Sequence, residues 1–538
     1  MPARAALAIC LALAALHTWP LAKAPASQSL NYNADAEQWE WTLSWIARTL
    51  PRAPAHVFDA NTFAHEPGTL AYSDPVIVPA ALAAPVRWLG GSPVLTFNIA
   101  LVTGLALTAW AGWFVAWRWT GSAGAGLVGG ALAAFNTHLL TRLPHVQAAH
   151  SWGIPLAIYF ADALVERPSW RTTLALAGVV AATAATSLYT LAFVGVIVGA
   201  ACVVALPRWA SAAAIAGGWV GGLVIAAPVL VPYAHFAASG ASRPLEMVAQ
   251  FSATPAAYLT SLTRLDAGWS SRFFRDEVNV LFAGIAAIAL AIAGGAAAAR
   301  DRTHRRRFLM LLLIAASGFV LSLGPSTALY RWVYAWFPPI RGLRAAARFG
   351  YLVLTVVALF AAIGVSQLAS RVRSARTRGV IAAAALVIVT VEAWSGPVPT
   401  LPFSRVPAIY GELARATTPV TLVEVPFYPP EAMFQNGEYV LNATGHWQPV
   451  MNGYSGFIPD SYRRRADTFW FFPRDWAIDS IKREGATHIM VHLEKFTPDE
   501  VRDINETLRS RNDLRLIASD ALGHRLYAIV APGPAGDR

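Results

Sequence analysis

The sequence predicts an α-helical polytopic membrane protein with about eleven transmembrane helices and a soluble α/β domain at its carboxyl end. Of the 538 residues, 56% are hydrophobic and only 14% are charged, whereas a soluble protein carries roughly 25% charged residues. Apolar runs of about 18 or more residues recur along the chain, which is long enough to cross a bilayer. After Gly396 the composition changes to that of ordinary soluble sequence.

Each predicted span is an apolar run bounded by charged or turn-forming residues. The run 172–206 is too long for one crossing at about 1.5 Å per residue, so we divide it near Ser187. The segment 75–89 is short and contains two prolines, so it is predicted to be an interfacial helix. The spans are predicted at about residues 3–21, 94–117, 121–140, 151–165, the two parts of 172–206, 212–231, 278–299, 308–323, 349–368 and 379–394.

The net charge of +11 is distributed as short arginine clusters between apolar runs. Eleven spans place Arg118, Arg167, Arg208 and the clusters 300–307 and 371–378 on one side, as the positive-inside rule requires. The expected location is a bacterial inner membrane, with the amino end cytoplasmic and the carboxyl-terminal domain extracytoplasmic. The amino-terminal segment resembles a secretory signal peptide, but we favour a first transmembrane span that is not cleaved. This charge pattern argues against a nucleic-acid partner.

The carboxyl-terminal region is predicted to be a separate domain, 397–538, following a transmembrane domain, 1–396. Strands alternating with helices are typical of a small α/β fold. The region has no phosphate loop and no nucleophile elbow, so we assign it no chemistry of its own. Strands are predicted at 421–425, 488–492, 514–517 and 525–530, and helices at 474–484 and 498–510. The two cysteines, Cys10 and Cys202, fall in apolar runs and indicate neither a disulfide framework nor a cysteine metal site.

The first long loop, 31–75, concentrates acidic residues in a chain that is otherwise poor in them. It carries Asp35, Glu37, Glu40, Asp59, Glu66 and Asp74, and the following segment 75–161 has no acidic residue. Ionisable groups beside a bilayer are costly and tend to mark a site. Tryptophan, phenylalanine and tyrosine residues lie between the acids. The loop is therefore predicted to form the floor of an active site on the outer side of the membrane.

Several short motifs are spread thinly over nearly the whole chain. They are Asp35 with Trp45, the segments 58–61 (FDAN), 67–73 (PGTLAYS), 142–147 (RLPHVQ), 341–349 (RGLRAAARF) and 452–457 (NGYSGF), together with Asn98, His446 and Trp447. With an acidic first outer loop and an outer carboxyl-terminal domain, they resemble the GT-C superfamily of membrane glycosyltransferases. The nearest resemblance is to the YfhO-type bacterial membrane proteins.

This resemblance implies transfer of a sugar from a polyprenyl-phosphate donor to a glycan or lipid acceptor of the cell envelope. The alternative is a non-catalytic flippase or assembly factor for envelope lipid or polysaccharide. The sequence departs from the commonest GT-C signature, because no two acidic residues are adjacent in the first loop and Ala36 separates Asp35 from Glu37. No cofactor is predicted, and a divalent metal is not supported by a motif.

Glycosyl transfer requires a base for the acceptor hydroxyl, and Asp35 is the predicted catalytic base, since a partly desolvated carboxylate has a raised pKa. The alternative is that Asp35 caps a helix starting at Ala36. Glu37, Asp59 and Glu66 are predicted to bind substrate. A mixed metal site at His56, Asp59, His65 and Glu66 matches no known spacing, so a hydrogen-bonded loop is favoured there.

Cationic side chains in the outer segments are candidates for the departing phosphate. Arg341, Arg344 and Arg348 would share one face if they were helical; the alternative is contact with lipid headgroups. Arg142 and His145 are further candidates. In the outer domain, His446, Asn452 and Tyr454 are predicted to stabilise a turn or to line the acceptor entrance.

Overall fold

The computed structural model describes residues 1–530 except 241, 277–278 and 302–304. Packing contacts divide the chain into two units. The helical unit consists of residues 1–25, 74–82 and 98–400, and the α/β unit consists of residues 26–73, 83–97 and the chain from Leu401 on. The acidic loop up to Ser73 therefore belongs to the same unit as the carboxyl-terminal region.

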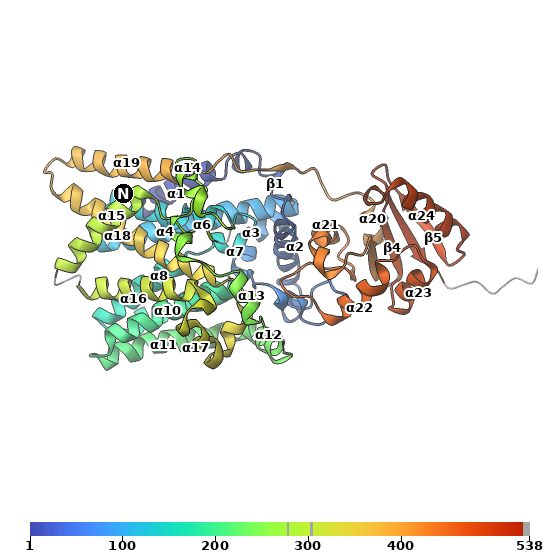
Figure 1. The fold of residues 1–538 in the computed structure, drawn as a ribbon, viewed down its shortest axis with the longest axis horizontal. Coiled ribbons are helices and arrows are strands. Elements are labelled where there is room, and N and C mark those ends of the chain that lie inside the picture. The colour runs from blue at the N-terminus through green and yellow to red at the C-terminus, as the bar shows by residue number, and fades with distance from the viewer. Residues whose placement is uncertain (241, 277–278, 302–304, 531–538) are drawn as a thin grey trace, which may run out of the picture. The chain divides into compact units, whose positions relative to one another are not determined.

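The long helices of the helical unit run side by side in Figure 1. They are α1 (Ala3–His17), α5 (Ala123–Ala134), α8 (Gly153–Glu166), α9 (Trp170–Ala184), α10 (Leu188–Ala205), α11 (Trp209–Ile225), α15 (Ile285–Arg300), α16 (Arg305–Ser322), α18 (Gly350–Ser370) and α19 (Ala375–Glu392). Helix α12 (Ala227–Ala238) follows α11 in the same unit. Helices α3 (Ile77–Trp88) and α4 (Pro93–Thr120) contribute residues to both units. Short helices connect them: α6 (Thr137–Leu140), α7 (Val146–Ala149), α13 (Leu245–Gln250), α14 (Ala267–Ser270) and α17 (Ala328–Trp336).

Helices lie where the apolar runs predict them, but their lengths differ from the predicted spans. The division near Ser187 is confirmed, since Ser187 is the N-cap of α10 and its side chain accepts from Thr190 N. The predicted span 121–140 is interrupted because Asn136 starts the separate α6. Helices α11 and α12 form a pair bent by 78°. Among the described residues three helices are long and apolar enough to cross a membrane, or four with the bent pair, so the count of eleven is not confirmed.

Small residues allow α15 and α18 to pack backbone against backbone. A Cβ atom on Gly294 would collide with the carbonyl oxygen of Phe360, and one on Gly364 would collide with the carbonyl oxygen of Leu290. Packing through small residues is a common way for helices to associate where no hydrophobic driving force exists between them.

A buried ion pair joins α8 and α16. Arg307 Nη2 lies 2.8 Å from Asp162 Oδ2, and the two side chains are 13% and 9% exposed. The same guanidinium lies over the ring of Trp119, 4.5 Å from its centroid. The sequence analysis used the cluster 300–307 only to predict which side of the membrane it faces. Arg307 has a further role, because its side chain packs within the helical unit.

The α/β unit contains a four-stranded sheet of order β3-β4-β6-β5. Its strands are β3 (Leu422–Val425), β4 (His488–His492), β5 (Leu514–Ser519) and β6 (His524–Ile529), and all four confirm predicted strands. β3 pairs parallel to β4, and the other two pairings are antiparallel. Helices α23 (Asp475–Arg483) and α24 (Pro498–Ser510) also lie where they were predicted, near β4 and β5 in Figure 1. The remaining elements of the unit are β1 (Gln28–Ser29), α2 (Ala34–Thr49), β2 (Leu401–Pro402), α20 (Tyr410–Ala414), α21 (Gly437–Asn442) and α22 (Asp460–Phe469).

The acidic loop contributes to the core of this unit, which explains why the two distant segments fold together. Phe63 is 1% exposed and packs in one cluster with Val423, Ile489 and Tyr462. Backbone hydrogen bonds join the segments, because Phe63 N donates to Asn452 O at 3.0 Å and Ala64 N donates to Val450 O at 2.8 Å.

Candidate functional site

Asp35 lies in the first turn of α2 and does not cap it. The N-cap is Asn33, whose side-chain oxygen accepts from Asp35 N at 2.9 Å, so the capping role considered for Asp35 is wrong. The Asp35 carboxylate instead accepts a hydrogen bond from the Tyr454 hydroxyl at 2.7 Å. A carboxylate in the first turn is also favoured by the helix dipole. The half-buried Asp35 side chain is therefore oriented by Tyr454.

Polar and aromatic side chains surround this part of α2 within the α/β unit. Gln38 Nε2 donates to Ser73 Oγ at 2.7 Å, and Ser73 Oγ lies 2.7 Å from Ser455 Oγ. Tyr72 packs on Phe457 with ring centroids 5.2 Å apart. The segments 31–73 and 452–457, which carry the resemblance motifs, thus meet in one unit. The structure thus brings hydroxyl, amide and aromatic groups together beside α2.

Two further acids on α2 are buried. Burial raises the pKa of Glu37 to about 8, the nearby Glu438 raises it further, and Lys495 opposes the shift. Glu40 is 0% exposed, and burial raises its pKa well above the ordinary value, with a further increase from Glu37. Asn31 donates to Glu40 at 3.2 Å and opposes that shift. The raised pKa of Glu37 keeps this carboxyl largely protonated at neutral pH, so Glu37 is better suited to donate a hydrogen bond than to act as a base.

The protonation of Glu37 predicts a pH-dependent stability. Its pKa rises from 4.5 to about 8 on folding, so the folded state holds the proton more tightly between these values and stability falls as the pH rises. Glu37→Gln, which stays neutral, should remove this dependence. Between pH 5.5 and 8 we expect the variant to lose about 2–3 kcal/mol less unfolding free energy than wild type.

Unfolding of the full-length protein in detergent, followed by tryptophan fluorescence, measures this difference. Glu506→Gln is the matched control, because Glu506 is exposed on α24 of the same unit. Parallel pH profiles for wild type and Glu37→Gln would contradict the prediction.

Asp59 and Glu66 interact with other residues of their own loop. Asp59 accepts from Gly68 N at 3.1 Å and pairs with His56 at 3.2 Å, where both side chains are at least half exposed. Burial raises the pKa of Tyr72 to about 12, and the charge of Glu66 adds to that shift. Over the described residues, His56, Asp59, His65 and Glu66 do not gather as a metal-ligand group. The structure thus favours the hydrogen-bonded loop.

In the helical unit, Arg142 and Arg348 line one small cavity. Its volume is about 30 Å³, which is room for about one water molecule. Arg142 follows α6 and Arg348 precedes α18, and the sequence analysis selected them as separate candidates. The structure places both in the lining of the same cavity. The cavity is lined by His138, Leu139, Arg142, Gln147, Ala148, Ser151, Ser187, Tyr189, Thr190, Phe193, Arg348 and Tyr351.

The two guanidinium groups are held differently. Arg142 is 6% exposed and donates to the carbonyl oxygen of His138 at 3.0 Å. Arg348 lies over the Tyr189 ring, 4.4 Å from the centroid, and its Nε atom is buried without a hydrogen-bond partner among the described residues. A buried donor without an acceptor is costly. Arg348 is thus the side chain of this cavity that has a donor available for an anion.

Asp74, the last acid of the loop, lies in the helical unit near Arg348. Its carboxylate accepts from Leu188 N at 2.8 Å and from Ser187 Oγ at 3.2 Å, at the start of α10. Burial raises the pKa of Asp74, whereas the Leu188 hydrogen bond and the charge of Arg348 oppose the shift. Asp74 therefore anchors the chain before α3 to the turn between α9 and α10.

The other predicted cations lie apart from the cavity. The segment around Arg341, Arg344 and Arg348 is not one helix, because Leu343 is extended (φ −98°, ψ 114°) between two short 3₁₀ turns. The prediction that these arginines share one helix face is therefore wrong. Arg341 donates to the carbonyl oxygens of Tyr334 and Ala335 at 3.0 and 2.8 Å. Arg344 lies over the Phe251 ring, 5.0 Å from its centroid. His145 follows Arg142 in the next turn, where its N–H donates to Arg142 O at 2.8 Å.

The outer-domain residues His446 and Asn452 have structural partners. Asn452 is 0% exposed, accepts from Glu424 N at 2.8 Å and donates to Glu424 O at 3.0 Å. His446 accepts from Gln448 N at 3.0 Å. His446 holds a turn, as predicted, whereas Asn452 holds the backbone of strand β3 and Tyr454 contacts the predicted base.

The fold is similar to that of membrane glycosyltransferases of known structure. It is similar to the arabinofuranosyltransferase AftD from Mycobacteria, with 16% sequence identity and a TM-score of 0.60, over 98% of this chain and 40% of that chain. The archaeal oligosaccharyltransferase AglB from Archaeoglobus fulgidus is 11% identical with a TM-score of 0.48, over 100% of this chain and 75% of that chain. The chain thus spans about two-fifths of the length of AftD.

The chain belongs to the DUF6311 family, a domain of unknown function whose model matches residues 5–392. No curated protein matches the sequence. The GT-C resemblance is confirmed at the level of fold, and the YfhO-type resemblance is not confirmed.

Proposed function

We propose that this protein is a membrane glycosyltransferase that transfers a sugar from a polyprenyl-phosphate donor to a glycan or lipid acceptor of the cell envelope, on the outer face of the inner membrane. The observation that carries the proposal is Asp35, a half-buried carboxylate that does not cap its helix and is oriented by Tyr454 at 2.7 Å. The GT-C fold over 98% of the chain supports it.

In the proposed reaction, the Asp35 carboxylate removes the proton of the acceptor hydroxyl as the hydroxyl oxygen attacks the anomeric carbon. The bond between that carbon and the phosphate oxygen breaks. The electron pair leaves with the polyprenyl phosphate, which departs with an additional negative charge. Tyr454 positions the carboxylate, and the aromatic residues Tyr72 and Phe457 provide a surface for the sugar ring.

A lipid phosphate is proposed to bind Arg348 in the helical unit, with Arg142 adding positive charge from the same cavity. A guanidinium is suited to phosphate, because it presents parallel N–H donors and keeps its charge. The cavity, at about 30 Å³, is smaller than a phosphate group, so Arg348 has to turn away from the Tyr189 ring for its guanidinium to meet the anion.

Arg348→Ala tests the assignment of the phosphate. Removing one charge-assisted contact should weaken binding of a short-chain polyprenyl phosphate by about ten- to a hundredfold. Binding to the purified full-length protein is measured by titration calorimetry in detergent. Arg331→Ala is the matched control, since Arg331 is exposed on α17 and donates to Pro325 O. Equal affinities for wild type and Arg348→Ala would remove Arg348 from the proposal.

A further inference from the structure

Two histidines and a glutamate meet at one end of the two central strands of the sheet in the α/β unit. His492 ends β4 and His524 begins β6, and the two are directly opposite in the antiparallel register. Cross-strand partners present their side chains on the same face. Their rings have centroids 4.9 Å apart. Glu494 follows β4 in a 3₁₀ turn that spans Leu493–Lys495.

The spacing of the three side chains fits a bound metal ion. One ligand atom from each residue lies within 4.8 Å of the others. His492 Nδ1 is 3.3 Å from Glu494 Oε1, and His524 Nε2 is 3.5 Å from the same oxygen. Tetrahedral zinc with bonds of about 2.0–2.1 Å separates its ligands by roughly 3.3 Å. The distances from Glu494 Oε1 to His492 Nδ1 and to His524 Nε2 are therefore already close to the distance between two ligands of a zinc ion.

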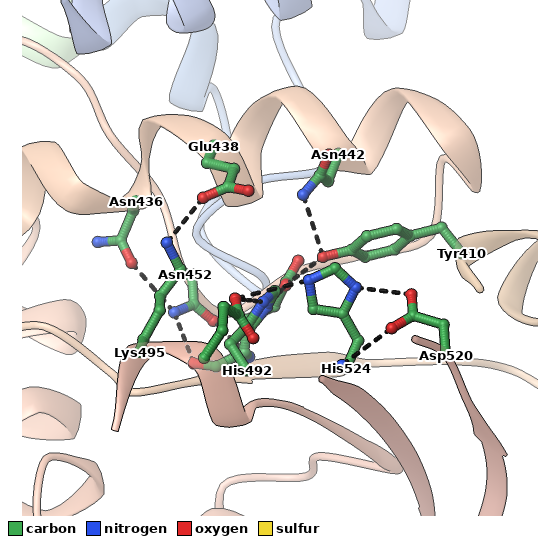
Figure 2. A network of polar contacts seen from close by, with 11 residues as sticks. Tyr410, Asn436, Glu438, Asn442, Asn452, His492, Lys495, Asp520 and His524 are labelled. Atoms are coloured by element: carbon green, nitrogen blue, oxygen red, sulfur yellow. Dashed lines mark hydrogen bonds and ion pairs between the residues drawn. The ribbon is translucent and has the colours of Figure 1, made fainter. Parts of the chain in front are cut away.

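The second ring nitrogen of each histidine is held by a carboxylate. His492 Nε2 lies 2.6 Å from Glu424 Oε2, and His524 Nδ1 lies 2.8 Å from Asp520 Oδ2 (Figure 2). Glu424 is itself held by the Tyr410 hydroxyl at 2.6 Å. In metal sites the ligating histidine almost always donates its other N–H to a carboxylate, carbonyl or water, which orients the ring.

The nitrogen that faces the centre of the group has no hydrogen bond of its own. His492 is 0% exposed, and its Nδ1 atom makes no hydrogen bond among the described residues, although Glu494 Oε1 is within ion-pair distance. Glu494 is 37% exposed, so the group is open to solvent on that side. A metal ion would coordinate the orphaned nitrogen and retain a water at the open position.

We propose that His492 Nδ1, Glu494 and His524 Nε2 bind one Zn²⁺ ion, with Glu424 and Asp520 orienting the two imidazole rings. Mixed imidazole and carboxylate ligands suit zinc. The ion would join the end of β4 to the hairpin between β5 and β6. This site is independent of the proposed glycosyl transfer and of every residue assigned to it.

The test uses the full-length protein in detergent, stripped with EDTA, incubated with ZnCl₂ and desalted. Retained zinc, measured by plasma mass spectrometry, is expected at about one ion per chain for a single site of this kind. His524→Gln and Glu494→Gln should each lose the retained zinc. Asp520→Asn, which removes the carboxylate oxygen beside His524 Nδ1 but can keep the oxygen that accepts from Leu522 N and His524 N, should weaken zinc affinity about ten- to a hundredfold.

Two further measurements keep the result unambiguous. His56→Gln alters an exposed histidine–aspartate pair and should retain zinc as wild type does. Circular dichroism verifies that each variant is folded. If His524→Gln does not fold, zinc retention by Glu494→Gln tests the site instead, because the Glu494 side chain is partly exposed and its substitution should disturb the fold less. If folded Glu494→Gln retains as much zinc as wild type, or wild type retains none, the proposal is wrong and the group is an ion-pair network.

Discussion

Asp35→Asn is expected to lower the rate of glycosyl transfer by about 10²–10⁴-fold, the usual contribution of a general base. Asparagine has the size of aspartate and keeps an oxygen that accepts from the Tyr454 hydroxyl, but it cannot remove a proton. The helix keeps its own cap, Asn33. Folding should therefore be nearly unchanged, apart from a dipole interaction of about 0.3–1 kcal/mol.

The measurement is transfer from a polyprenyl-phosphate sugar by purified protein, together with complementation of the envelope-sugar phenotype of a deletion strain. Asp460→Asn is the matched control, because Asp460 is an exposed acid in the first turn of α22 in the same unit. If Asp35→Asn complements fully while Arg348→Ala does not, the protein handles lipid without catalysis. If neither substitution matters, both the site and the function are wrong.

Arg307→Ala is expected to destabilise the helical unit by about 3–5 kcal/mol, which is typical of removing one partner of a buried ion pair. The substitution leaves Asp162 buried without its partner at 2.8 Å and removes the cation that covers Trp119. The result should be a clearly lower unfolding temperature in detergent. Arg306→Ala is the neighbouring control, since Arg306 is exposed on the same helix.

A double variant separates the lost pair from lost packing. Asp162→Leu combined with Arg307→Met replaces both charges with apolar side chains, so it should recover most of the stability that Arg307→Ala loses. The pair would be unimportant if Arg307→Ala and Arg306→Ala unfolded at the same temperature. A double variant less stable than Arg307→Ala would show that the two charges matter beyond their mutual contact.

Local patterns predicted the elements well and the contacts poorly. The strands at 421–425 and 488–492 and the helix at 498–510 were predicted from strand and helix patterns that alternate in the carboxyl-terminal region, and the structure has β3, β4 and α24 there. The capping role for Asp35 was wrong because the cap lies two residues earlier, at Asn33. The shared face of Arg341 and Arg348 was wrong because extended backbone at Leu343 interrupts the helix.

Site residues were predicted from charged side chains in apolar sequence. This criterion selected Arg142 and Arg348, but it could not show that the two residues line the same cavity. Glu40 was not selected, because its burial depends on how α2 packs within the α/β unit. The metal group was missed for a related reason. His492 and His524 are separated by a helix and a strand in the sequence, and only the register of β4 with β6 makes them neighbours.

The sequence by itself determined that the chain is rich in apolar helices, roughly which stretches of the chain they occupy, and that a small α/β fold follows them. Hydrophobic periodicity and turn residues act over a few neighbouring positions, so they can be read without a structure. Tertiary structure alone placed the acidic loop in the α/β unit, Tyr454 on Asp35, and the two histidines beside Glu494. These contacts join residues far apart in the chain, and they depend on strand register and core packing rather than on local preference.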